Sequence, residues 1–149
     1  MHTVQPTDCG KPHSKKLLIV VDMQQDFVYG SLATTEAQAI VARTREKIAA
    51  HGGELWFTLD THSEDYLESA EGKSLPVEHC IKGTGGHALV EELQEFAPRG
   101  RFFEKPTFGS VEMAQALKER KDIQCVELVG VCTDICVISN ALLLKAFRP

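Results

Sequence analysis

The sequence lacks an excess of basic charge and a long uninterrupted apolar run, and each absence excludes a class of partner. Lys and Arg number 16 against 21 Asp and Glu over 149 residues, a net charge of −5, which argues against a nucleic-acid surface. The most apolar region, 125–147, is interrupted by charged and polar residues and never reaches the roughly 18 apolar residues of a membrane span. We therefore expect no nucleic-acid or membrane partner.

The chain also lacks a secretory signal and a recognisable cysteine framework. The first 14 residues contain no apolar core of the kind that a signal peptide needs, and we expect residues 1–15 to be a flexible leader before a single domain over 16–149. The cysteines form an odd set of five without paired C-x-x-C knuckles: Cys9, Cys80, Cys125, Cys132 and Cys136. This favours a reducing compartment over a disulfide framework, so we expect a cytoplasmic protein.

Apolar runs and helical patterns alternate along the chain. Strands are expected at 17–21, 54–59, 101–104 and 125–129. Helices are expected after a capping box at Thr35, around Leu89 to Phe96, after a cap at Ser110, and over the apolar residues 138–144, which should be mostly buried. A long polar loop at 60–86 shows neither pattern. The alternation predicts a three-layer α/β/α fold with an open parallel sheet, whose site lies beyond the carboxyl ends of the strands.

Three of these strand ends carry residues for nucleophilic catalysis. Cys136 lies in the first turn of a predicted helix, where backbone amides and the helix dipole can lower a thiol pKa. Asp22 could accept the thiol proton, Lys105 could hold a cation beside it, and amides of the turn 131–136 could bind an oxyanion. Taken alone, each has an ordinary structural reading: a small buried cysteine, a turn aspartate and a surface lysine.

A second group of residues has the character of metal ligands. In extended backbone, Asp60 and His62 point the same way, and His79 beyond the polar loop could join them, with Glu71 or Glu68 as a further ligand. Oxygen and nitrogen donors of this kind suit zinc, manganese or iron. The alternative is that these side chains are simply solvated.

Together, three segments make the pattern specific: Val21-Asp22-Met23-Gln24-Gln25-Asp26-Phe27, Lys105, and Gly130-Val131-Cys132-Thr133-Asp134-Ile135-Cys136-Val137. From about Lys16 onward the chain resembles the isochorismatase-like cysteine hydrolases, of which the nicotinamidases are the best-known amidase branch. The resemblance implies their Rossmann-like α/β/α fold. That family normally continues past the last helix with another strand and helix, so we expect these two elements to be lacking here.

The resemblance assigns roles to the catalytic candidates. Asp22 is implied as general base and acid, Lys105 as its cationic partner, and Cys136 as the nucleophile that substrate acylates. The bond between Val131 and Cys132 resembles the family's non-proline cis peptide, and the amides of Cys132 and Cys136 are the implied oxyanion donors.

The resemblance also strengthens the prediction of a metal site. Asp60, His62 and His79 match the metal-binding elements of nicotinamidases, with zinc as the expected divalent ion and manganese or iron as alternatives. The remaining ligand is Glu71, which we prefer, or Glu68.

The implied activity is hydrolysis of a small amide, above all of nicotinamide to nicotinate and ammonia, as in NAD salvage, through a thioester on Cys136. Phe27 resembles the aromatic residue that packs against the planar substrate ring, and Leu75 replaces a tryptophan that nicotinamidases often have. Alternatives are a carbamoyl or ureide substrate, isochorismate, or a noncatalytic interaction protein. Isochorismate is disfavoured because it has no acyl carbonyl for Cys136 to attack. We also expect a homo-oligomer.

Overall fold

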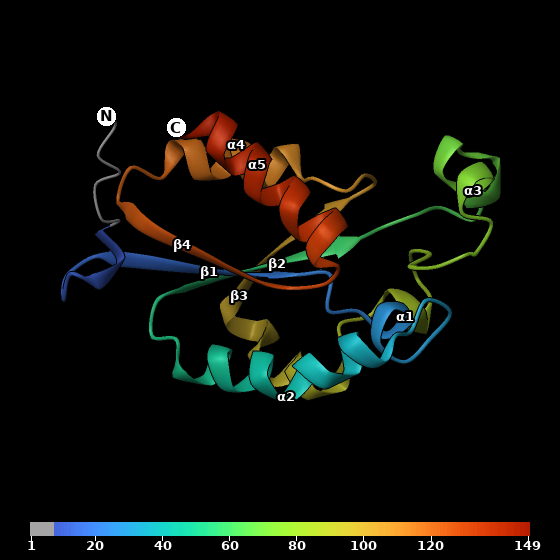
Figure 1. Ribbon diagram of the computed structural model, residues 1–149, viewed down its shortest axis with the longest axis horizontal. Coiled ribbons are helices and arrows are strands. Elements are labelled where there is room, and N and C mark those ends of the chain that lie inside the picture. The colour runs from blue at the N-terminus through green and yellow to red at the C-terminus, as the bar shows by residue number, and fades with distance from the viewer. Residues whose placement is uncertain (1–7) are drawn as a thin grey trace.

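A four-stranded parallel sheet forms the centre of the protein, and the computed structural model describes residues 8–149 (Figure 1). The strand order is β3-β2-β1-β4. The strands are β1 (Lys15–Val21), β2 (Glu54–Asp60), β3 (Gly100–Lys105) and β4 (Ile123–Gly130). All four predicted strands are present, and the expected α/β fold with an open parallel sheet is confirmed.

Helices cover both faces of this sheet. Figure 1 shows α2 on one face and α4 with α5 on the other. The α-helices are α1 (Gln25–Val28), α2 (Thr35–Ala50), α3 (Ala70–Ser74), α4 (Val111–Glu119) and α5 (Ile138–Phe147); 3-10 helices span Asp8–Gly10, Tyr66–Glu68, Gly85–His87 and Glu91–Arg99, and a π-helix spans Thr133–Val137. Within residues 8–149, no helix combines the length and apolarity needed to cross a membrane.

The hydrophobic core has two parts, one on each face of the sheet. Residues 17–21 are completely buried, because β1 pairs with β2 and β4 and is covered on both faces. Alternate side chains of a strand point to opposite faces, so Leu18 packs in the cluster that includes Val41 of α2, and Leu17 in the cluster that includes Leu117 of α4. This explains the continuous apolar run in the sequence.

The helix caps agree with the sequence at one helix and differ at another. Ser110 caps α4 as predicted, since its side chain accepts a hydrogen bond from the Met113 amide. The cap of α2 is Thr34, which accepts from the Ala37 amide, and not the predicted Thr35. Both threonines can fill this role, so the sequence pattern is one residue out of register.

Two further segments differ from the prediction. The helix expected around Leu89 to Phe96 is a 3-10 helix over Glu91–Arg99 that contains Pro98, which has no amide hydrogen to donate to an α-helical bond. The polar loop predicted without helices contains α3 and a 3-10 helix. Ser69 caps α3 by accepting from the Gly72 amide, a bond that stabilises this single short turn.

The prediction that the last helix is mostly buried is wrong. In α5 only Asn140 and Leu144 are buried, while Ile138 is 44% and Leu142 65% exposed. Ile138 and Leu142 are four residues apart and share a face of the helix. That face is exposed, so apolar composition did not imply burial here.

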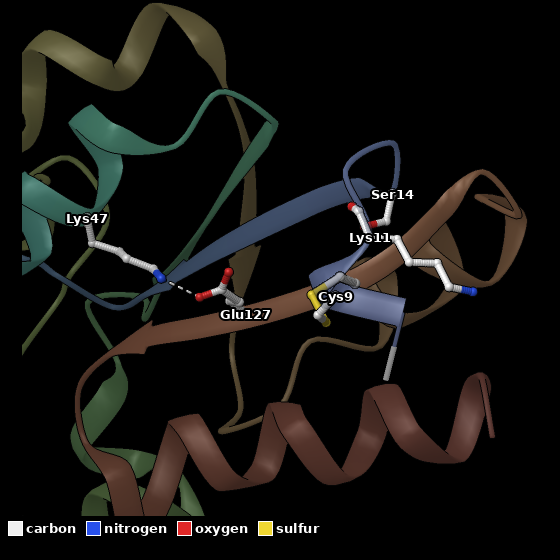
Figure 2. The surroundings of a disulfide bond; sticks show 6 residues. Cys9, Lys11, Ser14, Lys47 and Glu127 are labelled. Carbon is white, nitrogen blue, oxygen red and sulfur yellow. Dashed lines mark hydrogen bonds and ion pairs between the residues drawn. A yellow bond between two sulfur atoms is a disulfide. The ribbon is translucent and has the colours of Figure 1, made fainter. Parts of the chain in front are cut away.

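A disulfide joins the start of the chain to β4 and overturns the expectation of free cysteines. Cys9 is bonded to Cys125 across 116 positions of sequence, as Figure 2 shows, and cysteine spacing cannot reveal a pairing over that distance. The disulfide weakens the case for a reducing compartment, on which the cytoplasmic assignment depended. Of the expected flexible leader, residues 1–7 lie outside the described residues. From Asp8 onward the chain forms a 3-10 helix tied to β4, and Lys15 already belongs to β1.

Candidate active site and metal centre

The register of the sheet brings the predicted site residues to one edge. Asp60 pairs with Lys105 at the ends of β2 and β3, and the end of β1 pairs with Gly130 at the end of β4. Asp22 follows β1 directly, with φ of 50°, a left-handed conformation that Asp adopts more readily than most residues. Parallel strands therefore place these chemically active side chains side by side.

Asp22 and Lys105 form a buried ion pair. The distance from Lys105 Nζ to Asp22 Oδ2 is 2.7 Å, and the two side chains are 1% and 0% exposed. The other carboxylate oxygen, Oδ1, accepts a hydrogen bond of 2.7 Å from the Thr58 hydroxyl. The backbone carbonyl of Thr107 accepts a further bond from Lys105 Nζ. Both charged groups thus have specific partners in place of water.

Cys136 lies near this pair and follows β4, the edge strand opposite the β3 strand that carries Lys105. It lies in the π-helix that follows β4, and 7% of its surface is exposed. The thiol is close enough to Asp22 and Lys105 for both charges to act on it, and the backbone carbonyl of Cys136 accepts a bond of 2.8 Å from Asn140 Nδ2. π-helical turns occur frequently at functional sites. The structure thus brings together the aspartate, the lysine and the thiol.

The electrostatics of the three groups favour a protonated thiol at rest. Burial raises the pKa of Cys136, the charge of Asp22 raises it further, and Lys105 opposes both. Burial also raises the pKa of Asp22 against the effect of Lys105. The pKa of Lys105 is raised because nearby negative charges outweigh burial. The helix-terminus argument for a lowered thiol pKa is therefore wrong here, and the thiol needs a base.

The turn between β4 and Cys136 has an unusual backbone. The peptide bond between Val131 and Cys132 is cis. The Cys132 carbonyl accepts hydrogen bonds from the amides of Ile135 and Val137, which fold the turn back on itself. The assignment of the Cys132 and Cys136 amides to an oxyanion remains a prediction.

Four side chains form a candidate metal centre next to Lys105. The ligand atoms of Asp60, His62, Glu71 and His79 all lie within 4.8 Å of one another. Asp60 Oδ2 is 2.9 Å from His62 Nε2 and 3.3 Å from His79 Nε2, and Glu71 Oε1 is 3.9 Å from His79 Nε2. Among residues 8–149, this group of four does not include the alternative Glu68, whose side chain lies at an exposed position.

The donors fit a divalent cation such as zinc. Two carboxylates and two imidazoles are ligand types that zinc prefers. His79 Nδ1 bonds the Val77 carbonyl at 2.8 Å, which leaves Nε2 directed at the cluster, an arrangement typical of metal-binding histidines. Hydrogen bonds from His62 and His79 hold the pKa of Asp60 well below its usual range in spite of burial.

Asp60 also connects the two groups. Its Oδ1 lies 3.6 Å from Lys105 Nζ, while Oδ2 faces the histidines. The lysine is thus shared by the carboxylate beside the thiol and the carboxylate of the metal centre. One continuous polar site results.

Sequence reasoning missed Tyr66, which packs against both histidines. Its ring centroid lies 4.7 Å from that of His62 and 4.9 Å from that of His79, and its hydroxyl donates to the Leu75 carbonyl. The predicted ring-binding residue Phe27 lies 5.5 Å from His79 by ring centroids. Leu75 is 39% exposed. No sequence signal could have found Tyr66, because the 3-10 helix that carries it begins at Tyr66 and does not include His62.

A cavity of about 590 Å³ opens beside the metal centre. His62, Tyr66 and Glu71 line it together with the segment Pro106 to Thr107, which follows Lys105. A small molecule therefore has room next to the candidate ligands.

Comparison with known proteins agrees with this geometry. Residues 16–148 match the model of the isochorismatase domain. The chain is 35% identical to the isochorismatase family protein PncA of Bacillus subtilis strain 168, over 86% of this chain and 77% of that protein.

Solved structures of the same fold include two amidases. The pyrazinamidase of Pyrococcus horikoshii in complex with zinc is 28% identical, covers 89% of this chain and 79% of its own, and has a TM-score of 0.75. The pyrazinamidase/nicotinamidase of Streptococcus mutans UA159 is 31% identical, covers 89% and 80%, and has a TM-score of 0.74. The expected resemblance is confirmed: the chain belongs to the isochorismatase family.

Proposed function

We propose that the protein is a metal-assisted cysteine amidohydrolase that converts nicotinamide to nicotinate and ammonia. The observation that carries the proposal is the buried ion pair of Asp22 and Lys105, which lies close enough to the Cys136 thiol for both charges to act on it. A thiol, a base and a fixed cation close together are the groups that nucleophilic acyl transfer requires. The similarity to pyrazinamidases and nicotinamidases supports an amide as substrate.

The first half of the reaction forms a thioester. Asp22 takes the proton of Cys136 as Sγ attacks the amide carbonyl carbon, and the amides of Cys132 and Cys136 stabilise the resulting oxyanion. The carbon–nitrogen bond then breaks, and Asp22 returns the proton to the leaving nitrogen, which departs as ammonia. Lys105 keeps Asp22 charged and oriented before each transfer.

The second half releases the acid. Asp22 accepts a proton from water, which attacks the thioester carbonyl, and the carbon–sulfur bond breaks. Cys136 recovers its proton from Asp22, and the carboxylic acid leaves and loses its own proton to the solvent to give the carboxylate. The base and the nucleophile are thereby returned to their starting states.

The metal centre and the aromatic residues provide substrate binding. Asp60, His62, Glu71 and His79 would hold the cation, and a bound divalent ion supplies a Lewis acid that can anchor a lone pair such as that of a pyridine nitrogen, directly or through water. Phe27, which packs on His79, and Leu75 would contact the ring. We further propose that the protein is a homo-oligomer.

Mass spectrometry of the protein incubated with candidate amides tests the proposal. We expect ammonia release from nicotinamide and a nicotinoyl adduct on Cys136, and neither in Cys136→Ala. A panel with pyrazinamide, a carbamoylated amine and isochorismate separates the alternatives within the family. No turnover of any member, with a Cys136 no more reactive toward a thiol label than Cys80, would favour a noncatalytic protein instead.

A further inference from the structure

Two polar residues of the first motif have no part in the reaction described above. Asp22 and Phe27 are used, but Gln24 and Asp26 lie between them in the sequence, and their hydrogen bonds go to neither Cys136 nor Lys105. Gln24 is completely buried, and Asp26 is half-buried. A buried amide side chain is costly unless its hydrogen bonds are made, so its partners indicate what it does.

The partners of Gln24 are the backbone groups of a candidate metal ligand. Gln24 Oε1 accepts a hydrogen bond of 2.8 Å from the Asp60 amide, and Nε2 donates one of 2.8 Å to the Asp60 carbonyl. Nε2 also donates to the His87 carbonyl at 2.9 Å. Pairing of β1 with β2 stops at Val21. On the side of β2 that faces β1, the Gln24 side chain therefore takes the place of strand pairing at Asp60, the last residue of β2.

The partner of Asp26 is the backbone directly after a second candidate ligand. Asp26 Oδ2 accepts a hydrogen bond of 2.8 Å from the amide of Cys80, which follows His79. Cys80 has φ of 49°, a conformation that a residue with Cβ adopts only when its surroundings impose it. Its carbonyl accepts from the His62 amide at 3.0 Å. The backbone of Cys80, the residue after His79, is thus held through both its amide and its carbonyl.

Two glycines allow the Asp26 carboxylate to reach this position. A Cβ at Gly86 would lie 2.0 Å from Asp26 Oδ2, and a Cβ at Gly30 would lie 2.3 Å from Oδ1. Any side chain at either glycine would displace the carboxylate. The carboxylate is therefore enclosed by backbone on two sides and aimed at Cys80.

We propose that Gln24 and Asp26 are positioning residues that fix two metal ligands before the ion binds, Gln24 through Asp60 and Asp26 through His79. Both reach these ligands from the short segment that runs from the end of β1 into α1, and this segment also carries the base Asp22. The motif therefore supplies the base and supports two ligands of the metal centre from one short segment. This inference rests on the proposed metal-assisted function, since it concerns the ligands of that centre.

Zinc affinity of the purified full chain, measured by competition with a chromophoric chelator, tests the proposal. Loss of an outer hydrogen bond to a metal ligand typically costs about 10- to 100-fold in affinity. We expect losses of about this size in Gln24→Leu and Asp26→Ala. Asp26→Asn keeps an oxygen acceptor for the Cys80 amide, so its affinity should stay within about threefold of the parent protein.

Asn140→Leu provides a matched control. Asn140 is also completely buried, and its amide also makes three hydrogen bonds to backbone groups, those of Ser110, Phe108 and Cys136. It holds the nucleophile side of the site and no metal ligand. Asn140→Leu should lower the melting temperature of the metal-free protein as much as Gln24→Leu but leave zinc affinity unchanged.

The outcomes distinguish this inference from the proposed function. If the parent protein does not bind zinc, manganese or iron, the metal-assisted function fails and this inference with it. If the parent protein binds zinc and Asp26→Ala binds it equally well, only the positioning role fails. The same conclusion follows if Asn140→Leu loses as much affinity as Gln24→Leu. Should Gln24→Leu not fold, the comparison of Asp26→Ala with Asp26→Asn decides alone.

Discussion

Lys105 Nζ lies 2.7 Å from Asp22 Oδ2 in a site where the two side chains are 1% and 0% exposed. A buried ion pair gives little net stability, because desolvation offsets most of the attraction. The pair is therefore better explained by chemistry than by folding: it supplies a charged base beside a thiol that holds its proton.

Removing the charge of Lys105 should destabilise the folded protein. In Lys105→Met the Asp22 charge remains buried without its partner, so the free energy of unfolding at neutral pH should fall by about 3–5 kcal/mol. Denaturant unfolding measures this change. The double variant Lys105→Met with Asp22→Asn should recover much of the loss, and an additive double variant would show that the two side chains do not interact.

The pH dependence of turnover should report the Asp22 carboxyl. Asp22 must be unprotonated to accept the thiol proton, and burial raises its pKa above the usual aspartate value in spite of Lys105. The kcat/KM for nicotinamide should therefore fall with decreasing pH at a higher pH than an ordinary aspartate, near 4, would give. Metal content measured at each pH separates this effect from loss of the ion. An acid limb at or below about 4 would contradict it.

The sequence was most informative about those site residues whose positions depend only on the pairing of the strands. Asp22, Asp60 and Lys105 come directly after or at the ends of apolar runs, and parallel pairing brings such ends to one edge whatever the loops do. Their proximity could therefore be predicted without any knowledge of the loops.

Features that depend on loop geometry or on distant packing could not be predicted in this way. The 3-10 helix followed by α3 that carries Glu68 and Glu71 was expected to be a loop, and the preference for Glu71 came from the family resemblance alone. The exposure of Leu142 depends on what lies outside α5, and the direction of the Cys136 pKa depends on burial beside Asp22. In each case a tertiary contact outweighed a local pattern.

The metal centre predicts a difference between two nearby glutamates. Glu71→Gln should weaken zinc binding about tenfold or more, since it removes a charged ligand from the cluster. Glu68→Gln changes an exposed side chain outside that cluster and should leave affinity within about twofold, which makes it the matched control. Chelator competition on both variants measures the difference. Equal affinities, or a larger loss in Glu68→Gln, would exclude Glu71 as the fourth ligand.

Removal of the metal from the parent protein should abolish most of its amidase activity without unfolding it. The two-part core of the sheet does not include the metal ligands, so far-ultraviolet circular dichroism should be unchanged after chelation and dialysis. Activity should return on addition of zinc, manganese or iron, and the ion that restores it at the lowest concentration is the preferred cofactor. Full activity in metal-free protein would contradict a metal-assisted reaction.

The disulfide should contribute to stability without taking part in catalysis. Cys9 and Cys125 close a loop across 116 positions of sequence, and restricting the unfolded chain in this way typically contributes about 2–4 kcal/mol. Cys9→Ser should lower the free energy of unfolding by about that amount, and a reducing agent should have the same effect on the parent protein but none on the variant. Thiol titration in denaturant should count three free cysteines before reduction. Because the pair lies at the end of β4 opposite the catalytic turn, kcat for the folded variant should match that of the parent; five free thiols in the unreduced protein would contradict the bond itself.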